Sequence, residues 1–146
     1  MTAEEIIAKL RLAPHPEGGH YRQTWIADDT AEDTRGHTAR ATGTCIYFLL
    51  QDGEVSHWHK VDATEIWLYH AGAPLILSVA ETEAGPAVDH RLSPDLNEGA
   101  PQIIVPAHHW QGARSTGAFT LVSCTVSPGF HFEGFTLAPP GFDIPR

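Results

Sequence analysis

The stretch Gly53-Glu54-Val55-Ser56-His57-Trp58-His59, with Glu65 a few residues later, decides the fold that we expect for this chain. Two histidines stand one residue apart in a run typical of a β-strand, and residues 64–69 form a second such run after a short turn. Positions i and i+2 of a strand point to the same face. We therefore expect His57 and His59 to project together, with Glu65 returned to face them inside a sheet.

Two chemistries suit a pair of imidazoles and a carboxylate, and the sequence leaves both open. The first is a divalent metal (Fe, Mn, Ni or Zn), because imidazole and carboxylate are ligands of these ions. Its candidate ligands are His57, His59, Glu65 and Gln111. The second is proton transfer, in which a carboxylate holds His59 in one tautomer and raises its basicity. For that chemistry the candidate catalytic residues are His59, Glu65 and Tyr69, with Tyr47 as another candidate acid.

Composition favours a single β-rich domain over residues 1–146. Hydrophobic residues make up 42% of the chain and charged residues 18%, with 13 glycines and 11 prolines. Frequent glycine and proline favour short elements joined by tight turns. The net charge is −9 without a lysine or arginine cluster, so nucleic acid and anionic membranes are not expected partners. We expect a cytoplasmic protein, because the chain shows no signal peptide and no long apolar run.

The order of elements predicts a barrel or sandwich. Residues 1–13 are expected to contain the single helix, with Thr2 and Glu5 as a capping box. Strand-like runs then recur every eight to twelve residues with turn signals between them. Residues 28–42 are polar and predict a long loop, and residues 127–146 predict a tail that covers the barrel. Cys45 and Cys124 lie in apolar runs and are expected to be buried free thiols.

Six segments together carry a resemblance to the Cupin_5 family of the cupin superfamily. They are His15-Pro16-Glu17-Gly18-Gly19, Ile46-Tyr47-Phe48-Leu49-Leu50, Ser56-x-x-His59, Glu65-Ile66-Trp67, Val105-Pro106-x-x-x-Trp110-Gln111 and Val126-x-Pro128-Gly129-Phe130. The resemblance runs nearly end to end. It implies a double-stranded β-helix, or jelly roll, after one N-terminal α-helix, usually as a homodimer with a pocket in the barrel mouth.

The chain departs from the usual cupin motifs at two places. Glu65 follows His59 by six residues, where the pattern has four or five. The second motif would have glycine at His108 and histidine at Gln111. His59 corresponds to the recurrent histidine of the family, and His57 is a local addition.

An aromatic wall is expected around the pocket. If Glu65 points inward, Trp67 and Tyr69 do so as well, because they alternate along one strand. Such a pocket fits a small organic ligand, sugar-like or anionic. The arrangement resembles the sugar-nucleotide 3,5-epimerases, which share the barrel and use a histidine base and a tyrosine acid without metal. The pocket residues that we expect are Tyr47, His57, His59, Glu65, Trp67, Tyr69, Trp110 and Gln111.

The His15–Gly19 segment is interpreted as a structural turn, because proline and paired glycines are turn residues first. Arg22 follows it and could face an anionic ligand. The leading hypothesis is a small-molecule enzyme with epimerase-like, isomerase-like or metal-dependent chemistry. The alternative is a cupin that binds a small metabolite without catalysis.

Overall fold

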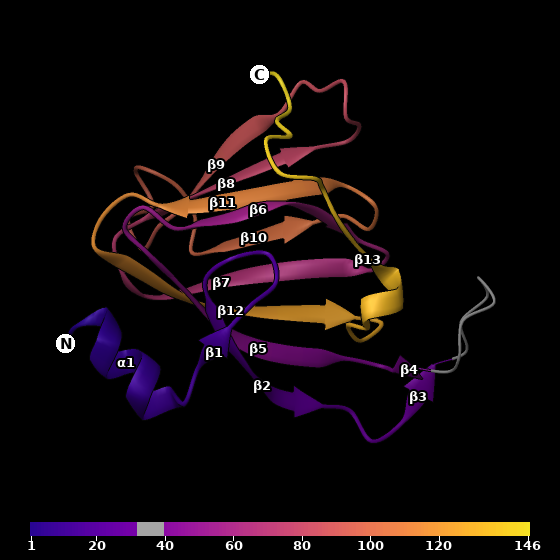
Figure 1. Cartoon of the computed structure of the whole chain (residues 1–146), viewed down its shortest axis with the longest axis horizontal. Coiled ribbons are helices and arrows are strands. Elements are labelled where there is room, and N and C mark those ends of the chain that lie inside the picture. Colours follow the sequence, from indigo (N-terminus) through magenta and orange to yellow (C-terminus); the bar gives the residue numbers. More distant parts are fainter. Residues whose placement is uncertain (32–39) are drawn as a thin grey trace.

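Two antiparallel sheets face each other in the computed structural model, which describes residues 1–31 and 40–146 (Figure 1). This is the jelly roll expected from the sequence, preceded by one helix. The elements are α1 (Ala3–Leu10), β1 (Ala13–Pro14), β2 (His20–Ile26), β3 (Thr30–Ala31), β4 (Arg40–Ala41), β5 (Thr44–Gln51), β6 (Val55–Val61), β7 (Thr64–Gly72), β8 (Leu75–Ala80), β9 (Val88–Leu92), β10 (Gln102–Val105), β11 (Trp110–Ser115), β12 (Phe119–Ser127), the 3-10 helix η1 (Phe132–Gly134) and β13 (Phe135–Leu137).

The strand order places the two candidate-site strands in different sheets. The larger sheet has the order β1-β2-β5-β12-β7-β10, and the smaller has β13-β6-β11-β8-β9. Strand β6 carries His59 and strand β7 carries Glu65, so these residues meet across the interior and not within one sheet. The short turn between the two strands is therefore the point at which the chain crosses from one sheet to the other.

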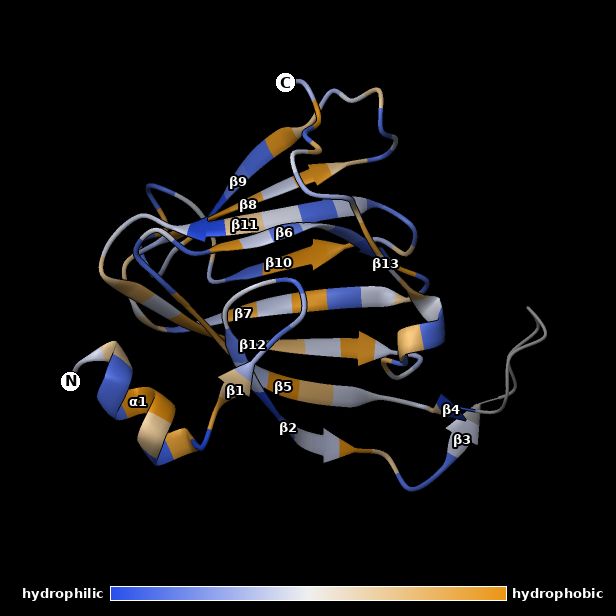
Figure 2. Cartoon of the chain, viewed as in Figure 1, coloured by the Kyte–Doolittle hydropathy of each residue, from blue (hydrophilic) through white to orange (hydrophobic). Residues whose placement is uncertain are grey.

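Helix α1 covers the outer face of the larger sheet. Thr2 and Glu5 form the expected capping box, and Arg11 ends the helix in the left-handed conformation. Hydrophobic and hydrophilic residues share this helix (Figure 2), and its apolar side packs with Leu12 against the buried Leu49 of β5. The helix ends three residues earlier than the predicted boundary at residue 13.

The interior between the sheets is divided along its length. One half is filled by a close-packed cluster that includes Phe48, Trp67 and Val122. The other half holds a cavity, because the residues that point inward at that end of the same strands include the polar Thr44 and Glu65. Strands β5, β7 and β12 thus contribute both to the core and to the cavity.

The C-terminal segment covers both the cavity mouth and the outer face of the smaller sheet. Strand β13 pairs with β6, and Ile144 is fully buried in a cluster with Trp58 and Trp110. Phe130, Phe132 and Phe135 of this segment line the cavity. Within residues 28–42, β3 and β4 form a small two-stranded sheet, and residues 32–39 lie outside the described residues.

Both cysteines are free thiols, with Cys124 buried and Cys45 partly buried. In the part of the chain that the structure describes, no helix is long and apolar enough to cross a membrane.

Candidate active site

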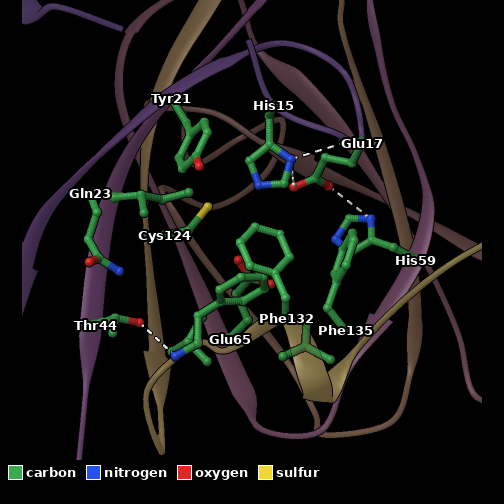
Figure 3. A pocket seen from close by; sticks show the side chains of 14 residues that line it. His15, Glu17, Tyr21, Gln23, Thr44, His59, Glu65, Cys124, Phe132 and Phe135 are labelled. Carbon is green, nitrogen blue, oxygen red and sulfur yellow. Dashed lines mark hydrogen bonds and ion pairs between the residues drawn. The ribbon is translucent and has the colours of Figure 1, made fainter. Parts of the chain in front are cut away.

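A cavity of about 190 Å³ opens at one end of the barrel, between the two sheets and the C-terminal segment (Figure 3). Its polar side chains come from both sheets and from the turn before β2, whereas three phenylalanines come from the C-terminal segment. The lining residues are His15, Glu17, Tyr21, Gln23, Thr44, Ile46, His59, Val61, Glu65, Cys124, Val126, Phe130, Phe132 and Phe135.

The turn His15–Gly19 delivers a carboxylate into this cavity. His15 N–H donates to the Gly19 carbonyl at 2.9 Å, and Gly18 N–H donates to the His15 carbonyl at 3.0 Å, which closes the turn. Gly18 and Gly19 both have positive φ, at 109° and 76°. A Cβ on Gly18 would overlap the Val55 carbonyl oxygen, so only glycine lets the turn lie this close to β6.

Glu17, at the tip of this turn, holds His59. The His59 Nδ1–H group donates to Glu17 Oε2 at 2.9 Å and to the His57 carbonyl oxygen at 2.7 Å. Ser56 Oγ donates to the same carboxylate oxygen at 2.5 Å. With Nδ1 engaged in this way, the other ring nitrogen of His59 is turned toward the cavity (Figure 3).

A β-bulge in β6 separates the two histidines that strict alternation would have placed together. Gln111 pairs with His59 and Ala113 pairs with Ser56, so His57 and Trp58 both lie opposite Gly112. The bulge turns His57 away from the cavity, and its Nε2 donates to the Pro139 carbonyl oxygen at 2.9 Å. The prediction that His57 and His59 share a face is therefore wrong. The freed His57 N–H donates to the Glu17 carbonyl at 2.8 Å and ties the turn to the bulge.

The pKa values of Glu17 and His59 move in opposite directions. Burial by itself lowers the pKa of His59, but the Glu17 charge and hydrogen bond outweigh it and raise this pKa to about 9. Burial favours the neutral form of Glu17, yet the charge and hydrogen bond of His59 lower the pKa of Glu17 below its usual value. At neutral pH the two residues are a buried imidazolium–carboxylate pair.

Glu65 faces this pair from the other sheet and behaves differently. Burial raises the pKa of Glu65 to about 7, the positive His59 opposes that rise, and the negative Glu17 adds to it. Gln111 Nε2 donates to Glu65 Oε1 at 2.9 Å, and Trp67 Nε1 donates to Gln111 Oε1 at 2.8 Å. The chain of donors from Trp67 fixes the amide orientation of Gln111 and so the position of the Glu65 carboxyl group.

His15 completes the polar side of the cavity as a neutral imidazole. Glu17 N–H donates to His15 Nδ1 at 3.1 Å, so that nitrogen carries no proton. The Glu17 carboxylate lies 3.3 Å from the same nitrogen, a distance that would suit an ion pair if His15 were charged. We favour the neutral form, because burial lowers the pKa of His15 and the charge of His59 lowers it further, against the opposing effect of Glu17.

The family model described as Cupin superfamily (DUF985), Cupin_5, matches residues 4–138. The chain belongs to the Cupin_5 family. The match includes the turn at His15–Gly19, both site strands and the C-terminal segment that closes the cavity. No curated protein matches the chain.

Solved structures of this fold include two with substantial sequence identity. A hypothetical protein from Leishmania major is 30% identical, with a TM-score of 0.88, and the match covers 97% of this chain and 90% of that one. A Shewanella oneidensis protein is 37% identical, with a TM-score of 0.85 and coverage of 94% and 85%. The oxalate decarboxylase of Bacillus subtilis is 11% identical, with a TM-score of 0.60 and coverage of 86% and 29%, and this likeness concerns the fold alone.

Three aromatic residues that the sequence placed in the pocket of this cupin lie elsewhere. Tyr47 follows the cavity residue Ile46, so it points to the opposite face of β5 and packs under α1. Trp110 precedes Gln111 and, for the same reason, packs on the outer face of β11. Tyr69 is on the inner face, but its hydroxyl donates to the Gly72 carbonyl at 2.6 Å, beyond Trp67 and away from the cavity.

Trp67 and Gln111 lie behind the cavity wall and contact it through Glu65. Neither lines the cavity, although both are buried. Of the eight pocket residues named from the sequence, His59 and Glu65 are thus the two that reach the cavity.

Cupins often bind a metal ion, and the expected ligand set of this chain does not fit one. His57 faces away from the cavity, and the Gln111 oxygen accepts a hydrogen bond from Trp67. The Nδ1 atom of His59 is held by Glu17. Over the described residues, no group of three or more histidine, cysteine, aspartate or glutamate side chains is placed to hold a metal ion.

Sequence reasoning missed the residue that holds His59. It assigns Glu17 to a structural turn and seeks the carboxylate partner of His59 at Glu65. One signal was available: an acidic residue between a proline and paired glycines sits on a rigid, sharply curved backbone, which is a site where a side chain can be positioned. The three phenylalanines of the C-terminal segment were missed because a tail rich in proline and glycine carries no strand periodicity.

Proposed function

We propose that this cupin is an enzyme that moves a proton on a carbon atom next to the carbonyl group of a small organic molecule. The observation that supports this most is that His59 and Glu65 line one cavity, with the pKa of His59 raised to about 9 and that of Glu65 raised to about 7. Between about pH 7 and pH 9, His59 holds its proton while Glu65 has lost its own. An acid and a base then coexist in one site, which is the arrangement that acid–base enzymes use.

The two groups would act on opposite ends of the reacting unit. The Glu65 carboxylate takes the proton from the carbon atom, and the electron pair moves to the carbonyl oxygen. The His59 Nε2–H group donates a hydrogen bond to that oxygen and stabilises the enolate. Return of the proton to the face that it left regenerates the substrate, whereas return to the opposite face of that carbon gives an epimer. Where that carbon carries a hydroxyl group whose proton passes to the carbonyl oxygen, return of the proton to the former carbonyl carbon gives an isomer, and in each case both side chains regain their starting states.

The residues around His59 and Glu65 hold these two side chains in place without reacting. Glu17 and the His57 carbonyl fix the His59 ring, so that Nε2 is the nitrogen presented to the substrate. Gln111 fixes the Glu65 carboxyl group from behind. Both supports are buried, which keeps water from competing for these hydrogen bonds.

Deuterium exchange tests this proposal without knowledge of the natural substrate. The protein is incubated in D₂O with acetone, dihydroxyacetone, pyruvate and 4-fluoroacetophenone, and deuterium at the carbon next to the carbonyl is measured by NMR. We expect exchange with at least one of these compounds above the buffer rate, lost in Glu65→Gln and reduced at least about 100-fold in His59→Gln.

The control for these variants is His57→Gln, on the same strand and with its ring outside the cavity. It is expected to keep the exchange rate. Equal loss in all three variants would show a folding defect. Exchange that survives in Glu65→Gln would contradict the assigned base.

A non-catalytic binding protein is the second candidate, and the phenylalanine wall favours it. Phe130, Phe132 and Phe135 offer apolar contact area and no reacting group. Ligands that bind in the cavity while no compound exchanges deuterium at any pH would support this candidate over the enzyme.

A further inference from the structure

We infer that the substrate is an uncharged carbonyl compound with an apolar group, and that carboxylates and phosphorylated compounds are excluded. The inference rests on the proposed proton-transfer site and adds its substrate class. It also replaces the sugar-like or anionic ligand expected from the sequence. Three features of the cavity carry it: its charges, its aromatic wall and its size.

Among the described residues, the charges of the cavity lining leave no free cation for an anionic ligand. Of the described residues that line it, His59 is the one with a positive charge at neutral pH, and the Glu17 carboxylate neutralises it at 2.9 Å. Glu65 is a second acid in the same space. A bound carboxylate or phosphate would have to leave water and lie beside two acidic groups, which is unfavourable without a free cation.

Three basic residues of the described part of the chain are engaged elsewhere. Arg22 Nε donates to the Leu10 carbonyl at 2.6 Å, and its guanidinium lies over Tyr47 on the outer face. Arg40 donates to both Asp62 oxygens at 3.0 Å and to the Gly129 carbonyl at 2.8 Å. Lys60 lies over the Trp110 ring, also outside. Arg22 therefore does not serve the anion that the sequence suggested for it.

The phenylalanine side of the cavity can bind an apolar group of a ligand. The rings of Phe130, Phe132 and Phe135 pack edge-to-face, with centroids 5.0 to 6.0 Å apart. Phe135 also lies 5.6 Å from the His59 ring. Phe132 is 57% exposed although it lines the cavity. Figure 3 shows its side chain among the polar side chains of the cavity. An exposed phenylalanine at a cavity is accounted for if a ligand covers it.

The size of the cavity limits how much of a ligand can be buried in it. At about 30 Å³ of liquid volume per water molecule, a cavity of about 190 Å³ corresponds to about six waters. That space suits a compound of the size of a substituted benzene. It is too small to enclose a sugar nucleotide.

Two fluorinated probes of matched shape test the inference by ¹⁹F NMR. 4-Fluoroacetophenone is neutral, and 4-fluorobenzoate carries the same ring with a carboxylate in place of the acetyl group. We expect the ketone to bind at least about ten-fold more tightly than the acid. Phe132→Ala is expected to weaken ketone binding at least about five-fold, and Leu137→Ala, an exposed residue of β13 outside the cavity, is expected to leave it unchanged.

A gain of function provides the complementary test. Gln23 lines the rim of the cavity and is exposed, so Gln23→Arg adds the missing cation without disturbing the core. We expect this variant to bind 4-fluorobenzoate at least about ten-fold more tightly than the unchanged protein does.

The outcomes separate this inference from the proposed function. Benzoate binding equal to ketone binding, or no ketone binding at millimolar concentration, would overturn the substrate class. Deuterium exchange found with pyruvate alone would also overturn it, while supporting the proton-transfer site. Ketone binding with the expected preference but without exchange of any compound would contradict the enzyme and leave the ligand class standing.

Discussion

Glu17 determines what His59 can do. A buried imidazole without a partner would be neutral near physiological pH, because burial disfavours the charge. Glu17 Oε2 accepts hydrogen bonds from both Ser56 and His59, and this carboxylate keeps the imidazole charged. The charge on His59 in turn stabilises the ionised form of Glu17. His59 is therefore the acid of the proposed reaction only because Glu17 keeps it charged.

Replacement of Glu17 by glutamine should destabilise the protein. The variant leaves a buried His59 without its counter-charge, and we expect a loss of about 3 kcal/mol in the free energy of unfolding at pH 7. The loss should shrink above pH 9, where His59 is neutral in the unchanged protein as well. Urea denaturation at both pH values measures it. Glu54→Gln removes the acid of another His–Glu pair, the partly exposed one with His20 at 3.9 Å, and should cost little.

The two hydrogen bonds of Gln111 should contribute to the stability of the protein and to the pKa of Glu65. Gln111→Leu leaves the buried Trp67 indole N–H without an acceptor, and we expect about 1 to 3 kcal/mol of destabilisation in urea. The pKa of Glu65 should rise, since the Gln111 hydrogen bond lowers it. In the Trp67→Phe background the same change should cost less, because the unpaired donor is gone. An equal cost in both backgrounds would contradict the role given to this hydrogen bond.

The bulge in β6 and the turn before β2 act together at the level of elements. The bulge turns His57 outward and releases its backbone N–H, which binds the Glu17 carbonyl. The turn can then lie against β6 with its carboxylate beside His59. Neither the bulge nor the turn alone would place the Glu17 carboxylate beside His59.

Gly18→Ala should break this contact between the two elements. A Cβ at this position would overlap the Val55 carbonyl, and φ is 109°. Gly53→Ala is the matched control, because Gly53 has φ of 81° but a Cβ added there would meet no atom within 4 Å. We expect the control to lose about 1 kcal/mol from the unfavourable φ, and Gly18→Ala to lose clearly more. Equal losses in thermal or urea unfolding would show that the close approach is unimportant.

Much of the fold could be predicted from local pattern, and the site only in part. Alternation and turn residues predicted the strands and the capped helix, and His59 and Glu65 do reach one cavity. The position of His57 could not be predicted, because a single extra residue in β6 reverses the alternation. Glu17 is brought to His59 across a long sequence separation, which local periodicity does not report. The expected homodimer and cytoplasmic location stay predictions.

In the whole molecule, the apolar core and the proposed reactive site lie inside the same barrel. One half is packed with apolar side chains, and the other holds buried ionisable groups, among them Glu17, His59 and Glu65. Buried ionisable groups make folding depend on pH, because their pKa values differ between the folded and unfolded states. The free energy of unfolding of the entire protein should therefore depend on pH through the ionisable groups of the cavity.

Stability should fall as pH rises from about 5 to 9. The pKa of His59 is about 9 when folded and 6.5 as the ordinary value, so its stabilising effect is present below pH 6.5 and is lost as pH rises through 9. This effect is about 3 kcal/mol. Glu65 has a raised pKa of about 7, so the folded state loses stability between about pH 4.5 and 7. Urea denaturation across this range measures both.

The Glu65→Gln variant separates the two contributions. It should flatten the decline between about pH 4.5 and 7, because no carboxyl group remains to ionise at this position. The decline above pH 6.5 that comes from His59 should persist. A stability profile that rises steadily from pH 5 to 9 in the unchanged protein would contradict both assignments. Glu17 acts at the acidic end: its lowered pKa gives stability above about pH 4.5 that is lost as pH falls further.

At neutral pH, His59 is a buried imidazolium paired with Glu17. Titration of the His59 ring nitrogens by ¹H–¹⁵N NMR tests this charge state, and the Glu17→Gln variant shows how the titration changes without the carboxylate. We expect both nitrogens to carry protons at pH 7. One proton should be lost near pH 9 in the unchanged protein and at clearly lower pH in the variant. A His59 that is neutral at pH 7, or that titrates at the same pH in both proteins, would contradict it.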